Sequence, residues 1–118
     1  METKNTGFSR IIRAFFYSLA GLRHVYVSEA AFRQECWIGA VLFVLACAAD
    51  VTKAEHLALI GSLVLVLIVE IINSAFETVI NRISTEIHPL SKQVKDMASA
   101  AVLLALLNVL LTWFIVFI

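Results

Sequence analysis

Residues 57–80 read LALIGSLVLVLIVEIINSAFETVI, and this almost wholly apolar stretch decides the fold. A helix of about 20 mainly apolar residues can cross a bilayer. An ionised side chain near its middle costs about 3 kcal/mol, so Glu70 is expected to face protein or a water-filled cleft and to have a function. Since a helix turns about 100° per residue, Glu70, Asn73 and Glu77 share one stripe of its surface. The stretch therefore predicts a membrane helix with a polar, functional face.

The rest of the chain has the composition of a membrane protein. Of its 118 residues, 61% are hydrophobic and 15% are charged, whereas about 25% of a typical soluble domain is charged. The formal net charge is zero, which argues against a nucleic-acid partner. The predicted fold class is an all-α membrane protein with three transmembrane helices and an N-terminal interfacial amphipathic helix. We expect one domain over residues 1–118, with the surface helix at 6–27 and membrane helices at 29–49, 53–82 and 89–118.

Local signals mark where the membrane helices begin. Ser28 is a candidate N-cap for the first of them. Thr52 followed three residues later by Glu55 is a capping-box pattern for the second. Pro89, the only proline, suits the first position of the third helix.

The segment before the first span is amphipathic. Its apolar residues recur at helical spacing, and they are Phe8, Ile11, Ile12, Phe15, Phe16, Leu19, Leu22 and Tyr26. Arg10, Tyr17 and His24 lie on the opposite side. This pattern is typical of a helix lying in the membrane interface, and a helix packed on protein is the alternative.

The basic residues predict the orientation of the chain in the membrane. They gather before the first span and between the second and third, whereas residues 50–56 contain only Lys53. The N-terminus is therefore expected to be cytoplasmic and the C-terminus external. Three thin helices cannot surround the polar stripe, so we expect a homo-oligomer.

Several polar residues near the cytoplasmic ends of the spans suit phosphate chemistry. The carboxylates of Glu29 and Glu77 suit Mg²⁺, which usually binds one or two carboxylates together with substrate phosphates. No glycine-rich phosphate loop is present, so Lys95 and metal ions would have to neutralise a nucleotide. A carboxyl group shielded from water, such as Glu70, is suited to accept a proton near neutral pH. The alternatives are that Glu70 only joins helices and that Lys95 with Asp96 forms an ordinary charged pair at a helix end.

Several motifs closely resemble the prokaryotic diacylglycerol kinase family of small integral membrane enzymes. The matching motifs are EIINSAFE at residues 70–77, EIH at 86–88 and KDMASAAVLL at 95–104. GFSRIIRA at residues 7–14 and EAAFRQE at 29–35 extend the likeness over almost the whole chain. The last two motifs look more like the diacylglycerol branch than the undecaprenol kinase branch of the family.

This resemblance implies a homotrimer in the bacterial cytoplasmic membrane, with active sites shared between subunits. It implies transfer of the ATP γ-phosphoryl group to the primary hydroxyl of diacylglycerol, with Glu70 as general base and Mg²⁺ held by Glu29 and Glu77. The implied nucleotide-binding residues are Arg10, Tyr17, Glu29, Asn73, Glu77, Glu86, His88, Lys95 and Asp96. The implied lipid-binding residues are Arg10, Ala14, Ser18, Arg23, Ala31, Glu35, Glu70, Ser99 and Trp113.

The chain departs from the family pattern at Asn81, where relatives commonly carry Asp. Any role that needs a negative charge there is in doubt. Three other functions are compatible with parts of the sequence: an undecaprenol kinase, a small homo-oligomeric proton-coupled transporter in which Glu70 titrates, and a structural membrane subunit. The acidic and basic residues Glu29, Glu77, Lys95 and Asp96 favour a kinase, because a proton relay does not need a metal and phosphate site.

Overall fold

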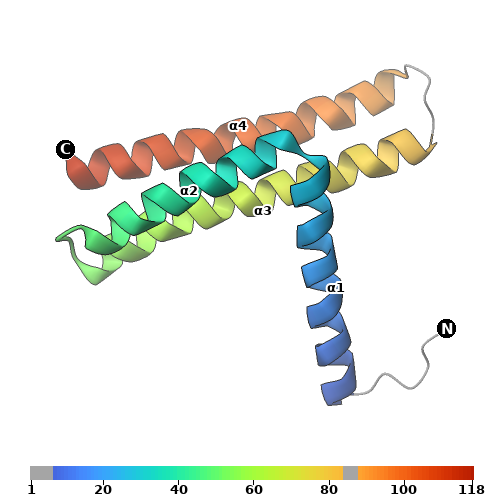
Figure 1. Ribbon diagram of the computed structural model, residues 1–118. Coiled ribbons are helices and arrows are strands. Elements are labelled where there is room, and N and C mark those ends of the chain that lie inside the picture. The colour runs from blue at the N-terminus through green and yellow to red at the C-terminus, as the bar shows by residue number, and fades with distance from the viewer. Residues whose placement is uncertain (1–6, 84–87) are drawn as a thin grey trace.

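The computed structural model describes residues 7–83 and 88–118 and contains four helices. They are α1 (Gly7–Ser28), α2 (Ala30–Ala48), α3 (Lys53–Ile83) and α4 (Pro89–Phe117). α2 and α4 each lie lengthwise along α3, and α1 leaves this bundle sideways (Figure 1). α2, α3 and α4 are each long and apolar enough to cross a membrane. The predicted fold class is confirmed, and no strand occurs in the described part of the chain.

Two of the three predicted helix starts are confirmed. The backbone N–H of Thr52 donates to the Glu55 carboxylate at 2.9 Å, and the backbone N–H of Glu55 donates to the Thr52 hydroxyl at 3.1 Å, which is a complete capping box. Pro89 opens α4, and the Leu90 N–H donates to Nδ1 of His88 at 3.1 Å. His88 therefore caps this helix.

The prediction for Ser28 is wrong. Glu29 is the N-cap residue of α2, and its side chain makes no capping hydrogen bond. The Ser28 hydroxyl instead donates to the carbonyl of His24 at 2.8 Å, one turn back in α1. A serine near a helix end can bond either way, and here it belongs to the end of α1.

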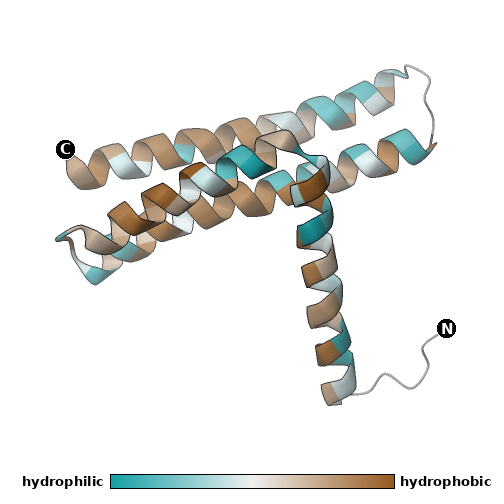
Figure 2. Ribbon diagram, viewed as in Figure 1, coloured by the Kyte–Doolittle hydropathy of each residue, from teal (hydrophilic) through white to brown (hydrophobic). Residues whose placement is uncertain are grey.

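Most apolar side chains face outward. The buried hydrophobic residues of the described chain are few, namely Val25, Phe32, Ala46, Leu59, Val66 and Ala105. The long helices are brown along most of their length, with hydrophilic residues toward their ends (Figure 2). So much exposed apolar surface is unfavourable in water, whereas in a bilayer it contacts lipid chains. This surface fits a protein embedded in a bilayer.

A polar contact joins α3 and α4, the two longest helices, away from the end where α3 leads into α4. The indole Nε1 of Trp113 in α4 donates to the hydroxyl of Ser62 in α3 at 3.2 Å. Ser62 is 3% exposed, and its hydroxyl donates in turn to the carbonyl of Leu59 at 2.7 Å. This contact lies about 12 Å along α3 from Glu70, eight residues at 1.5 Å each.

Candidate active site

The site is centred on two acidic side chains from neighbouring helices. Glu70 of α3 is 9% exposed, the most buried carboxylate among the described residues. The carboxyl group of Glu35 in α2 lies close enough to that of Glu70 for the two to interact. The Oε1 atom of Glu35 is buried and has no hydrogen-bond partner in the described structure. A carboxylate that is shielded from water and lies in the bundle interior is a candidate general base.

Glu70 begins a polar stripe along the inner side of α3. Asn73 and Glu77, at helical spacing from it, are half-buried, whereas Ile72 and Phe76 between them are exposed. The stripe predicted from the spacing is therefore turned inward. Glu29, which precedes α2, is also half-buried.

The donor set of one chain suits a metal that arrives with its ligand. Within residues 7–83 and 88–118, no group of three or more His, Cys, Asp or Glu side chains is placed to hold a metal ion. Mg²⁺ takes one or two carboxylates when substrate phosphates supply further oxygens. Glu29 and Glu77 supply two such carboxylates, and their joint binding of Mg²⁺ stays a prediction.

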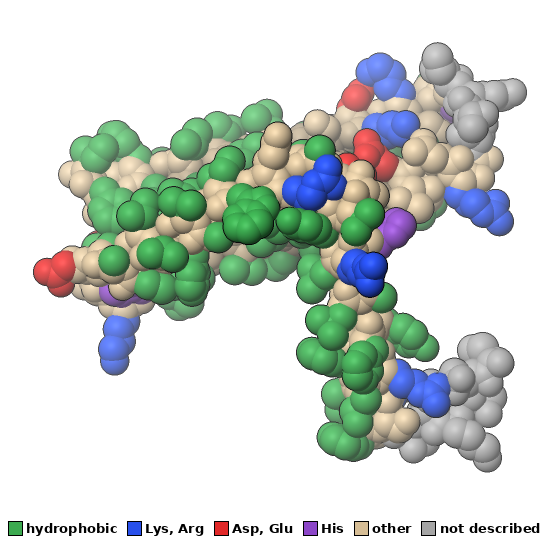
Figure 3. All heavy atoms as spheres, in the orientation of Figure 1, with side chains coloured by type: hydrophobic (Ala, Val, Ile, Leu, Met, Phe, Trp, Pro, Cys, Tyr) green, Lys and Arg blue, Asp and Glu red, His purple; other side chains and the backbone are tan. Residues whose placement is uncertain are grey.

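Charged side chains gather where α3 ends and α4 begins (Figure 3). Lys92 forms an ion pair with Asp96 at 2.7 Å. Lys95, one of the predicted phosphate-binding residues, donates instead to the amide oxygen of Asn81 at 3.4 Å. The positive charge of Lys95 therefore contacts a neutral group. Glu86, also predicted to bind nucleotide, lies outside the described residues.

The residues predicted on α1 are not brought against Glu70 within one chain. The N-terminal half of α1 projects away from the bundle (Figure 1), and Val25 is the only buried residue of this helix. The predicted α1 residues are all exposed, namely Arg10, Ala14, Tyr17, Ser18 and Arg23.

Three other predicted lipid-side residues are also separate from the carboxyl pair. Ala31 and Ser99 are exposed. Trp113 lies against Ser62 of α3 and Phe117 of its own helix. The roles predicted for these residues, like those on α1, remain predictions.

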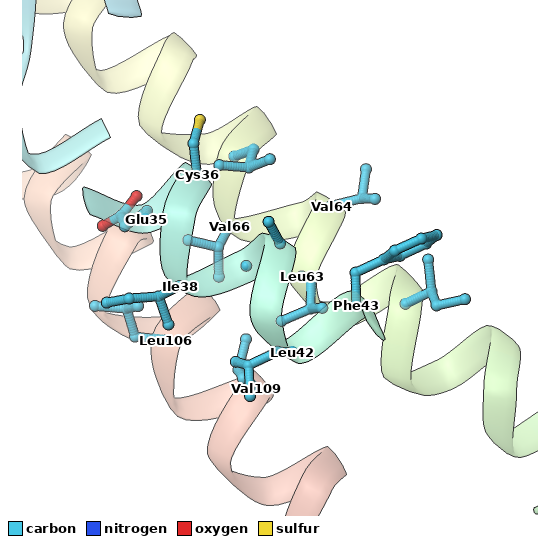
Figure 4. Close-up of a pocket in the computed structure, with 14 residues that line it drawn as sticks. Glu35, Cys36, Ile38, Leu42, Phe43, Leu63, Val64, Val66, Leu106 and Val109 are labelled. Carbon is cyan, nitrogen blue, oxygen red and sulfur yellow. The ribbon is translucent and has the colours of Figure 1, made fainter. Parts of the chain in front are cut away.

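An apolar groove runs from Glu35 along the bundle. Its volume is about 420 Å³, and its walls come from α2, α3 and α4. Glu35 lies at one end, and side chains such as Leu42, Leu63 and Val109 line the rest (Figure 4). The sequence analysis did not predict this groove, because its residues are ordinary membrane-helix residues that only the helix arrangement brings together. A hydrocarbon chain with a polar group at one end would match it in length and polarity.

Comparison with known proteins gives one consistent result. The family model described as "Prokaryotic diacylglycerol kinase" matches residues 16–117. A diacylglycerol kinase of Escherichia coli (strain K12) is 50% identical over 113 residues, covering 96% of this chain and 93% of that protein. A diacylglycerol kinase of Pseudomonas aeruginosa is 46% identical over 108 residues, with 92% and 88% covered. One of Haemophilus influenzae is 43% identical over 110 residues, with 93% of each covered. With three helices long and apolar enough to cross a membrane and a buried glutamate on one of them, this chain belongs to the prokaryotic diacylglycerol kinase family.

Proposed function

We propose that this protein transfers the γ-phosphoryl group of ATP to the primary hydroxyl of diacylglycerol, giving phosphatidic acid and ADP. The observation that carries the proposal is the buried Glu70 side chain beside Glu35, which lies at the end of an apolar groove. The groove would take hydrocarbon of the lipid, and the carboxyl pair would receive the alcohol at its end. Membership of the family supports the same reaction.

The chemistry needs alignment and charge neutralisation more than covalent help from the protein. The lipid oxygen forms a bond to the γ-phosphorus while the bond from that phosphorus to the β,γ-bridging oxygen breaks. Glu70 accepts the hydroxyl proton. Lys95 offsets charge on the phosphates, and Asn73 and Asp96 contact the nucleotide. Glu29 and Glu77 would hold Mg²⁺ that comes with ATP, and that ion would supply further neutralisation of phosphate charge.

The remaining predicted nucleotide contacts require a second subunit. Arg10 and Tyr17 lie on a helix that points away from its own Glu70 (Figure 1). The exposed apolar surfaces of α2, α3 and α4 leave room for close contact between copies. A homotrimer in which α1 of one subunit reaches the site of the next would bring these groups together. We place this assembly in the bacterial inner membrane, with the N-terminus in the cytoplasm.

The nearest alternative is phosphorylation of a long isoprenoid alcohol such as undecaprenol. A direct test is incubation of the detergent-purified protein with labelled ATP and an equimolar mixture of dioleoylglycerol and undecaprenol. We expect labelled phosphatidic acid as the main product. Label mainly in undecaprenyl phosphate would overturn the choice of substrate. Label in neither lipid, from protein that is folded and binds MgATP, would overturn the proposed reaction.

A further inference from the structure

The junction between α1 and α2 contains an arginine that closes the end of α1. Nη1 of Arg33, in the first turn of α2, donates to the carbonyl oxygens of Tyr26 and Val27, both at 2.8 Å. Carbonyls in the last turn of a helix lack partners within that helix. A cation there also interacts favourably with the helix dipole. Arg33 therefore supplies the C-terminal capping of α1 from a different helix.

A second side chain of α2 contacts the same turn of α1. Nε1 of Trp37, one turn after Arg33, donates to the phenolic oxygen of Tyr26 at 3.2 Å. Val25 and Phe32, on the two sides of the junction, are each 4% exposed. We call Tyr26, Arg33 and Trp37 the α1 corner.

Little of the rest of α1 is buried. Apart from Val25, no residue of α1 is buried. A bilayer surface would keep an amphipathic helix in its plane but would leave its direction within that plane free. Arg10 lies about 24 Å along the helix from Tyr26, so a 15° swing at the junction moves it by roughly 6 Å. A displacement of this size would remove a contact with phosphate.

We propose that the α1 corner fixes the direction of α1 and so sets where Arg10 and Tyr17 meet the nucleotide. Tyr26, Arg33 and Trp37 are then positioning residues, because they act on Arg10 and Tyr17 through the direction of α1. This inference rests on the proposed function, in which Arg10 and Tyr17 bind ATP. The inference predicts that substitutions in the α1 corner weaken ATP binding. The apolar groove, which α2, α3 and α4 form, should stay intact.

The first test measures the direction of α1. Spin labels are placed at Ser9 and Lys53, both exposed, after replacement of Cys36 and Cys47 by alanine. Labelled subunits are diluted with unlabelled ones in lipid nanodiscs. Arg33→Gln should broaden the distance distribution, because the shorter glutamine side chain does not reach the two carbonyls and carries no charge. Gln34→Ala, a change at the neighbouring exposed residue, should leave it unchanged.

The second test measures the kinetic result of the same variants. Arg33→Gln should raise the KM for ATP roughly tenfold and leave the KM for diacylglycerol within about twofold of wild type. The KM of Arg33→Lys for ATP should fall between those of wild type and Arg33→Gln, because an ammonium keeps the charge but loses the fork of donors. Tyr26→Phe and Trp37→Phe remove one shared hydrogen bond, so the double variant should be no worse than either single variant.

The outcomes separate the two proposals. An unchanged distance distribution in Arg33→Gln, or equal rises in both KM values, would overturn the role of the α1 corner. If Arg33→Gln fails to fold, the milder Trp37→Phe variant decides by the same measurements. An unchanged KM for ATP in Arg10→Ala, with the corner intact, would instead overturn the placing of ATP against α1.

Discussion

Nζ of Lys95 lies 3.4 Å from the amide oxygen of Asn81, so the contact of this cation with α3 is to a neutral group. Its neighbour Lys92 is paired with the carboxylate of Asp96 at 2.7 Å. The two lysines of this helix end thus differ in how much of their charge is already compensated. Position 81 is Asn and not Asp, so this contact does not compensate the charge of Lys95.

The substitution Asn81→Asp should therefore weaken ATP binding. The new carboxylate would pair with Lys95 and compete with phosphate for it. An exposed pair of this kind is worth about 0.2–1 kcal/mol, so we expect the KM for ATP to rise up to about fivefold, with little change in kcat. The difference should shrink at high ionic strength. Asn81→Ala, which removes the acceptor without adding charge, is the control, and a rise of equal size there would show that charge is not the cause.

Replacement of Glu70 by Gln should abolish proton acceptance while keeping the size of the side chain. We expect turnover to fall by roughly 10²-fold or more, with MgATP binding and thermal stability near those of wild type. Glu55→Gln is a matched control on the same helix, because Gln also completes a capping box. Near-normal turnover in Glu70→Gln would remove Glu70 from the role of base.

The apolar groove can be narrowed without disturbing the backbone. A Cβ atom added at Gly39, which lines the groove, meets nothing within 4 Å, and the same is true at Gly61, which does not line it. Gly39→Leu should raise the KM for dioleoylglycerol by about tenfold, since the new side chain displaces part of the lipid hydrocarbon. Its KM for ATP should stay unchanged. Gly61→Leu is the control, and an equal effect there would mean that the groove is not where the lipid binds.

The parts of the fold that depend on short-range pattern could be predicted from the sequence. The apolar run around Glu70, the capping box at Thr52 and the proline at the start of α4 each act within a few residues. The inward stripe of Glu70, Asn73 and Glu77 follows from helical spacing in the same way. Ser28 shows the limit, because a serine hydroxyl at a helix junction can bond backward or forward and local sequence does not decide which.

The parts of the site that depend on contacts between helices were not predictable. Nothing in the EAAFRQE motif says that Glu35 would meet Glu70 or that Arg33 would cap α1, because both contacts depend on how α2 lies against its neighbours. The groove is likewise built from residues that look alike in sequence, such as Leu42 and Leu63. Contacts between subunits are harder still to predict from the sequence, since even the structure of a single chain shows only which surfaces are exposed.

The hydrogen bond between Trp113 and Ser62 should stabilise the bundle, and loss of Ser62 should cost more than loss of the indole. In Trp113→Phe the Ser62 hydroxyl keeps its bond to the Leu59 carbonyl, and the ring can still pack on Phe117. We expect the free energy of unfolding to fall by roughly 0.5–1.5 kcal/mol, the usual range for one such bond.

In Ser62→Ala the half-buried indole N–H of Trp113 loses its acceptor, and an unpaired donor costs more than a bond lost with both partners. Ser62→Ala should therefore be the more damaging single change, and adding it to Trp113→Phe should cost little further. Unfolding of purified protein in mixed micelles, followed by circular dichroism, measures all three variants. Additive losses would show that the two side chains do not act through a shared bond. The KM for diacylglycerol separately tests the predicted lipid role of Trp113. If that role is right, this KM changes in Trp113→Phe and does not change in Ser62→Ala.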